Sequence, residues 1–114
     1  MFILRYQTPP QWAELVLQDF DTFLQDHAGA EKKASGMATS MLSHYPDRIL
    51  LVEAMLDLAL EEMAHFRSVV KLMIERGVTL GKDSKDPYVN NFRKHMRNGA
   101  DVYFLDRLLV AGII

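Results

Sequence analysis

Two long runs of apolar residues at helical spacing, separated by one proline, most constrain the fold of this 114-residue chain. The first run extends from Trp12 to Met41 and the second from Leu51 to Leu72. In both, apolar residues recur at intervals of three and four, as they do on one face of an α-helix. Pro46 lies between the runs. We therefore expect two helices of roughly 35 and 30 residues, about 45–50 Å long, paired antiparallel around a tight turn.

The ends of these helices also have sequence signals. Thr8, followed by Pro9 and Pro10, is a suitable start for the first helix, because proline is tolerated in a first turn. Asp47 is expected to cap the second helix, and Gly77 to end it.

The rest of the chain predicts shorter elements. Residues 77–91 are rich in glycine, lysine and aspartate and predict a surface loop. A short helix is expected over residues 88–98, stopped by Gly99. A further apolar helix is expected from near Asp101 to the last residue, without a C-terminal cap. No strand pattern or repeat is visible. The predicted fold is all-α: an antiparallel helical hairpin plus a truncated third helix.

Composition excludes several classes of protein. The chain is 49% hydrophobic and 25% charged with a formal net charge of −2, which suits one globular domain with a core. It has no cysteine, so disulfides, iron–sulfur clusters and thiolate zinc sites are excluded. No signal-peptide core or membrane-spanning run of apolar residues is present. We expect a cytoplasmic protein that does not contact the membrane.

Three charged or polar residues interrupt the apolar faces. Glu62 and His65 form an E-x-x-H pair in register with the second run, and Glu31 lies in register with the first. A buried carboxylate costs several kcal/mol unless it is paired or binds a metal. Glu31 lies about 15 residues before Pro46 and Glu62 about 16 after it. In an antiparallel hairpin the two carboxylates should therefore meet at the same height, with His65 beside them.

These residue types favour a metal site. Carboxylates and an imidazole without sulfur suit iron or manganese better than copper or structural zinc. A zinc-protease H-E-x-x-H motif is excluded because position 61 is Glu61. One glutamate on one helix and E-x-x-H on the next make half of the ferritin-like di-metal carboxylate site. The alternative is a structural protein whose charges merely pair across the seam.

The flanking residues resemble a known family. The segments DHAGAEKKASGMA (26–38), EEMAHFRSVVKLMIERG (61–77), FRKHMRNG (92–99) and FLDRLLVAGII (104–114) are similar to the tRNA 2-methylthio-N6-isopentenyladenosine hydroxylases. The resemblance spans nearly the whole chain. It implies a ferritin-like, non-haem di-iron monooxygenase that uses dioxygen to hydroxylate the isopentenyl side chain of a modified adenosine in tRNA.

The resemblance also implies roles for individual residues. Glu31, Glu62 and His65 would be iron ligands, with Glu62 as the bridge between two iron ions. His27, one turn before Glu31, would be a core residue or a residue that supports the ligands, rather than a ligand itself. The basic cluster of Arg93, Lys94, His95 and Arg97 would either contact tRNA phosphates or be ordinary surface charge. Nothing in the sequence indicates the electron donor.

The chain departs from the family pattern at its end. In the family the third long helix continues into a further glutamate, and a fourth helix supplies a second E-x-x-H, whereas this chain stops at Ile114. We therefore expect a single ferritin-like domain, incomplete at its C-terminus, or a homodimer or larger oligomer that combines two half sites. The competing interpretations are a ferritin-like metal-binding protein without tRNA chemistry, and a purely structural helical oligomer.

Overall fold

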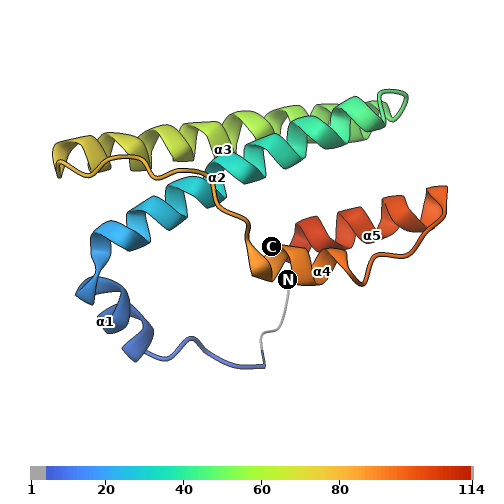
Figure 1. Ribbon diagram of the computed structural model, residues 1–114. Coiled ribbons are helices and arrows are strands. Elements are labelled where there is room, and N and C mark those ends of the chain that lie inside the picture. Colours follow the sequence, from blue (N-terminus) through green and yellow to red (C-terminus); the bar gives the residue numbers. More distant parts are fainter. Residues whose placement is uncertain (1–4, 114) are drawn as a thin grey trace. The chain divides into compact units, whose positions relative to one another are not determined.

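The computed structural model describes residues 5–113, which form five α-helices and no strand (Figure 1). The helices are α1 (Gln11–Gln18), α2 (Phe20–His44), α3 (Ile49–Glu75), α4 (Pro87–Arg93) and α5 (Ala100–Ile113). The chain divides into two compact units, Met1–Gly81 with α1 to α3 and Lys82–Ile114 with α4 and α5. The predicted all-α class is confirmed. None of the described helices is both long and apolar enough to cross a membrane.

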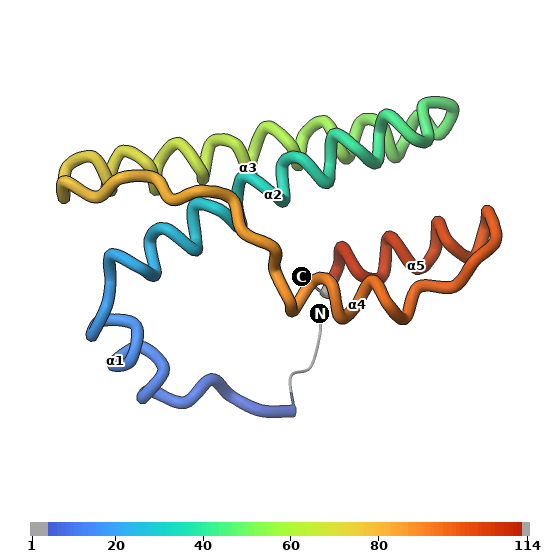
Figure 2. Tube along the Cα trace, viewed as in Figure 1, coloured from blue at the N-terminus to red at the C-terminus, as the bar shows by residue number. Residues whose placement is uncertain are grey.

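Helices α2 and α3 form the predicted antiparallel hairpin and lie side by side along their lengths (Figure 2). The turn between them runs from Tyr45 to Arg48, and the Arg48 N–H donates a hydrogen bond to the Tyr45 carbonyl (3.1 Å). The predicted cap, Asp47, is wrong by one residue. Because the turn closes between Tyr45 and Arg48, Asp47 lies inside it, and Arg48 takes the cap position without a side-chain hydrogen bond.

The predicted first helix is broken at Asp19, so α1 has eight residues and α2 has 25. Asp19 has a non-helical backbone (φ −143°, ψ 68°). Its carboxylate accepts hydrogen bonds from the Thr22 backbone N–H (3.3 Å) and hydroxyl (2.8 Å). This is a helix N-cap, which satisfies donors that a helix start would otherwise leave unpaired. Thr8 also lies outside α1, whose cap position is Pro10.

Gly77 ends α3 as predicted. Its φ of +72° is a left-handed conformation that glycine adopts without strain. The Gly77 N–H bonds to the Ile74 carbonyl (3.0 Å), and the Val78 N–H bonds to the Met73 carbonyl (2.8 Å). This pair of hydrogen bonds is a Schellman motif. It turns Val78 back against the core cluster that contains Met73.

The core of the first unit follows the α2–α3 seam, but the buried face differs from the predicted stripe. In α3, Met73 is 1% exposed whereas the expected Leu72 is 39% exposed. The apolar spacing of the first run includes Phe23 and His27 in the buried stripe. Early in α2, however, it is the residue after each of them, Leu24 and Ala28, that is buried. The break at Asp19 resets the phase of α2, and a strict three-four pattern drifts around a helix of 3.6 residues per turn.

The second unit contains α4 and α5. The Asp86 carboxylate caps α4 by accepting from the Tyr88 N–H (2.9 Å), and Pro87 occupies the first helical turn. The predicted helix over 88–98 is therefore one residue late at its start and five residues too long at its end, since α4 ends at Arg93. Gly99 (φ +113°) precedes α5, close to the predicted start near Asp101. The predicted end of this helix at Ile114 lies outside the described residues.

Candidate metal centre

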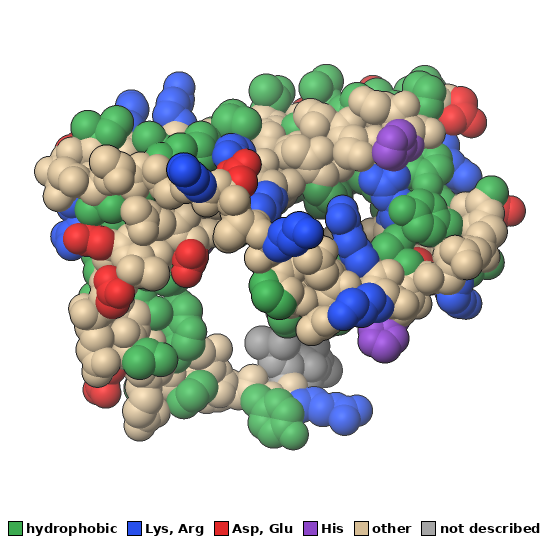
Figure 3. Space-filling model, in the orientation of Figure 1, with side chains coloured by type: hydrophobic (Ala, Val, Ile, Leu, Met, Phe, Trp, Pro, Cys, Tyr) green, Lys and Arg blue, Asp and Glu red, His purple; other side chains and the backbone are tan. Residues whose placement is uncertain are grey.

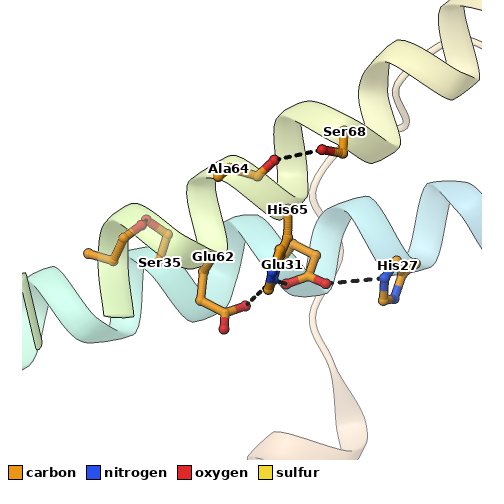
Figure 4. Close-up of polar contacts among 8 residues, drawn as sticks. His27, Glu31, Ser35, Glu62, Ala64, His65 and Ser68 are labelled. Atoms are coloured by element: carbon orange, nitrogen blue, oxygen red, sulfur yellow. Dashed lines mark hydrogen bonds and ion pairs between the residues drawn. The ribbon is translucent and has the colours of Figure 1, made fainter. Parts of the chain in front are cut away.

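Glu31, Glu62 and His65 converge in the middle of the α2–α3 hairpin, as Figure 4 shows. One potential ligand atom from each residue lies within 4.8 Å of the others. The His65 Nδ1 is 3.8 Å from the Glu31 Oε2 and 3.9 Å from the Glu62 Oε2. Helix α2 supplies Glu31, and one turn of α3 supplies the other two. The two carboxylates meet at the same height, as their similar distances along the chain from Pro46 predicted.

The three side chains differ in exposure. The Glu31 and Glu62 side chains are 15% and 19% exposed, so both carboxylates lie within the seam. His65 was expected in the buried stripe but its side chain is 52% exposed. A two-helix hairpin covers only the residues directly between its helices, and His65 lies at the edge of that contact. Its imidazole is accessible to a ligand from outside the hairpin.

The electrostatics of the site disfavour two neighbouring negative charges. A hydrogen bond with the Glu31 carboxyl group raises the pKa of Glu62 above its usual range. Partial burial and the charge of Glu31 act in the same direction, whereas His65 opposes them. The hairpin therefore holds together two carboxyl groups that repel each other when both are ionised. A cation between them would remove this repulsion.

His27 supports Glu31 from the preceding turn of α2. Its Nε2 lies 3.1 Å from the Glu31 Oε1, and the two side chains contact each other directly in Figure 4. Its ring stacks on Phe23 (centroids 5.6 Å apart, planes at 9°). Phe23 in turn contacts Trp12 of α1 edge to face, at 6.1 Å. His27 is 44% exposed, so it supports the carboxylate from the rim rather than from the core.

Polar contacts fix the helices on both sides of the site. The buried Ser35 hydroxyl donates to the Ala59 carbonyl on α3 (2.9 Å), one turn from Glu31. Further along the hairpin, the Arg76 guanidinium bonds to the Asp21 carboxylate (2.8 Å). The sequence pattern did not identify these two contacts between α2 and α3. The only available signal for Ser35 was a small polar residue among apolar ones.

The donor set fits a transition-metal ion. Two carboxylates and one imidazole, without sulfur, suit iron or manganese. The ligands come from two helices joined by a short turn and clamped by Ser35, so little ordering is needed on binding. Within residues 5–113, no other group of three His, Asp or Glu ligand atoms comes this close.

The residues expected to contact tRNA lie in the second unit and divide into two kinds. The Arg97 guanidinium bonds to both oxygens of the Asp106 carboxylate (2.7 and 3.0 Å), and the Arg97 N–H adds a third bond (2.8 Å). These bonds lower the pKa of Asp106 to about 2. Arg93 and Lys94 have exposed side chains on and just after α4.

Comparison with known proteins identifies the fold and the family of this chain. A solved Synechococcus structure, described as protein 43 with aldehyde deformylating oxygenase activity, superposes with a TM-score of 0.88 at 34% identity. The match covers 99% of this chain and 56% of that one. The ferritin-like hairpin of this chain is therefore the same fold element as in that oxygenase.

A curated relative from Pseudomonas putida is named tRNA 2-(methylsulfanyl)-N(6)-isopentenyladenosine(37) hydroxylase. It is 36% identical over 107 residues, which are 94% of this chain and 52% of the relative. The chain thus spans about half the length of that relative. The sequence model of the family described as tRNA-(MS[2]IO[6]A)-hydroxylase (MiaE) matches residues 1–114. The chain therefore belongs to this family of tRNA hydroxylases.

Proposed function

We propose that this chain supplies half of the ligand set of a di-iron centre that hydroxylates the isopentenyl side chain of a modified adenosine in tRNA. The observation that carries the proposal is the convergence of Glu31, Glu62 and His65 in a chain that belongs to the hydroxylase family. Neither part suffices alone, because acidic clusters occur without a metal and family membership alone assigns no residues.

Each residue has a distinct role in this proposal. Glu31 and His65 would bind an iron ion from opposite helices, with Glu62 as the bridging carboxylate. His27 orients Glu31 through its 3.1 Å contact. Bound iron would supply the reaction with dioxygen that oxidation of an unactivated C–H bond requires. The hairpin holds the ligands in position and keeps the two carboxylates partly shielded from water.

A complete centre of this type needs a second set of ligands. Either the remainder of a longer protein or a two-fold symmetric dimer would provide it. In the dimer, two copies bring two Glu31 side chains and two Glu62–His65 pairs to one axis. A tRNA substrate would place the protein in the cytoplasm, in agreement with the sequence-based expectation.

The first experiment measures metal binding and oligomeric state. The purified chain is loaded with Fe(II) without oxygen, and iron content and molar mass are measured together by elemental analysis and light scattering. We expect a dimer that binds about two iron ions, the number in one complete ferritin-like di-metal site. The loaded protein is then given oxygen, a reductant and tRNA carrying the isopentenyl group. A gain of one oxygen atom in that nucleoside, measured by mass spectrometry, is the expected product.

The outcomes separate the competing functions. Iron binding without hydroxylation would favour a ferritin-like metal-binding protein without tRNA chemistry. A chain that binds neither iron nor manganese would contradict the proposal and favour a structural role. A monomer that binds one iron ion would contradict the symmetric completion of the site.

A further inference from the structure

An open hollow lies beside α4 in the second unit. Its volume is about 660 Å³. The residues that line it are Lys85, Pro87, Asn90, Asn91, Arg93 and Lys94. Three of the six are cationic, two carry carboxamides and none is acidic. Figure 3 shows Lys and Arg side chains, in blue, over the part of the surface that α4 occupies.

The charges around this hollow are not neutralised locally. Within the described part of the chain, no carboxylate forms an ion pair with Lys85 or Arg93. The Lys94 Nζ lies 3.4 Å from the Asn91 Oδ1, a neutral acceptor. Asp86, the adjacent acidic residue, accepts hydrogen bonds from the Tyr88 and Val89 N–H groups and caps α4. The hollow therefore combines positive charge with amide donors.

Arg97 is chemically different although it lies only three residues from Lys94. Its guanidinium is paired with the Asp106 carboxylate, which cancels its charge and ties the segment after α4 to α5. It lines a separate, smaller hollow together with Asp106 and Leu109. The sequence analysis grouped Arg97 with Arg93 and Lys94. In the structure, Arg97 forms an ion pair with Asp106, whereas Arg93 and Lys94 line the hollow without an acidic partner among the described residues.

We propose that Lys85, Arg93 and Lys94 form a phosphate-binding surface for an RNA backbone, and that Arg97 is not part of it. Cations bind phosphodiester oxygens, and Asn side chains also donate hydrogen bonds to phosphates and sugars. The choice of RNA among polyanions rests on the proposed function. The surface would bind without sequence preference and would weaken with salt, since phosphate contacts release counterions.

The test measures binding alone, with the full metal-free chain and an unmodified tRNA transcript. Fluorescence anisotropy is followed from 50 to 200 mM salt. We expect Arg93→Ala and Lys94→Ala each to weaken binding several-fold and to reduce the slope of log K against log salt by about one. Lys71→Ala on α3 removes one exposed charge elsewhere and is the matched control. Circular dichroism checks that every variant keeps its helices.

Two results with the variants would overturn the inference, and so would a third result, with heparin. In one, Arg93→Ala and Lys94→Ala bind the transcript with the affinity and salt slope of the parent chain. In the other, Lys71→Ala weakens binding as much as they do, so that binding follows net charge only. Because neither iron nor a modified nucleoside is used, failure of the hydroxylase proposal leaves this measurement intact. Equal affinity for heparin and for the transcript would likewise reject RNA as the selected partner.

Discussion

Glu31 and Glu62 bring their carboxyl groups close together across the α2–α3 seam, and this proximity raises the pKa of Glu62. Two adjacent acids in a partly buried seam oppose folding when both are ionised. The same arrangement favours a cation, because a metal ion between the two carboxylates pairs with both and removes their repulsion. The same pair of carboxyl groups thus lowers the stability of the metal-free chain and raises its affinity for a metal ion.

Glu62→Gln should separate stability from metal binding. The amide keeps the shape of the side chain and can still donate to Glu31, but it removes the like charge. At pH 7 we expect the metal-free variant to unfold at an equal or higher temperature than the parent chain. Its Fe(II) affinity should fall by more than about tenfold, since losing even a supporting residue costs ~10–100-fold. Calorimetry and metal titration measure the two effects, and a variant that keeps full Fe(II) affinity would exclude Glu62 as a ligand.

His27→Ala should weaken metal binding without removing a ligand. The substitution deletes the 3.1 Å contact that orients the Glu31 carboxylate. We expect a loss of about 10–100-fold in Fe(II) or Mn(II) affinity. His27→Gln retains an N–H donor and should recover part of the loss. His95→Ala, an exposed histidine in the second unit, is the control. Unchanged affinity in His27→Ala would show that Glu31 is positioned by other contacts.

Ser35→Ala should loosen the hairpin near the site. It removes the buried hydrogen bond to the Ala59 carbonyl, and a bond of this kind contributes about 1 kcal/mol. Ser43→Ala is the matched control, because its hydroxyl donates to the Thr39 carbonyl in an exposed position. We expect urea unfolding to show a decrease of ~1 kcal/mol for Ser35→Ala and less than ~0.5 kcal/mol for Ser43→Ala. Equal effects would mean that the clamp adds nothing beyond a local contact.

The Arg97–Asp106 pair predicts a pH dependence in the second unit. Asp106 titrates with a pKa of about 2 in the folded chain, below its ordinary value of 3.8. A lowered pKa of an acid stabilises the folded state above the ordinary value, and this stabilisation is lost as the pH falls from about 4 to 2. The Arg97 amide donates to the Asp106 Oδ2, so its NMR shift should titrate near pH 2.

Asp106→Asn provides the comparison for this titration. The variant should be less stable than the parent chain at pH 6, and the difference should shrink as the pH approaches 2. An Arg97 amide that titrates near pH 4 in the parent chain would contradict the strength of this ion pair.

The hairpin and the meeting of Glu31 with Glu62 were predictable because both follow from local periodicity and distance from the turn. The break at Asp19 was not, since the apolar spacing of Val16, Phe20 and Phe23 continues across it. There the capping hydrogen bonds to Thr22 outweigh continuation of the helix.

Two further features could not be predicted from the spacing of residues along the chain. The half-exposed position of His65 depends on how many helices surround the seam, which spacing along one helix does not specify. The pairing of Arg97 with Asp106 depends on the turn after α4, where the predicted helix was too long. In both cases the residue type was identified but its neighbours were not.

The aromatic contacts from Trp12 through Phe23 to His27 have a practical consequence. Trp12 is the only tryptophan in the chain, and its indole lies against Phe23, whose ring stacks on the imidazole that contacts Glu31. α1 buries no residue of its own, so its attachment to α2 depends largely on such ring contacts. Intrinsic fluorescence is thus an optical probe built into this fold: one emission band reports both the docking of α1 and, through quenching by a paramagnetic ion, the occupancy of the neighbouring carboxylates.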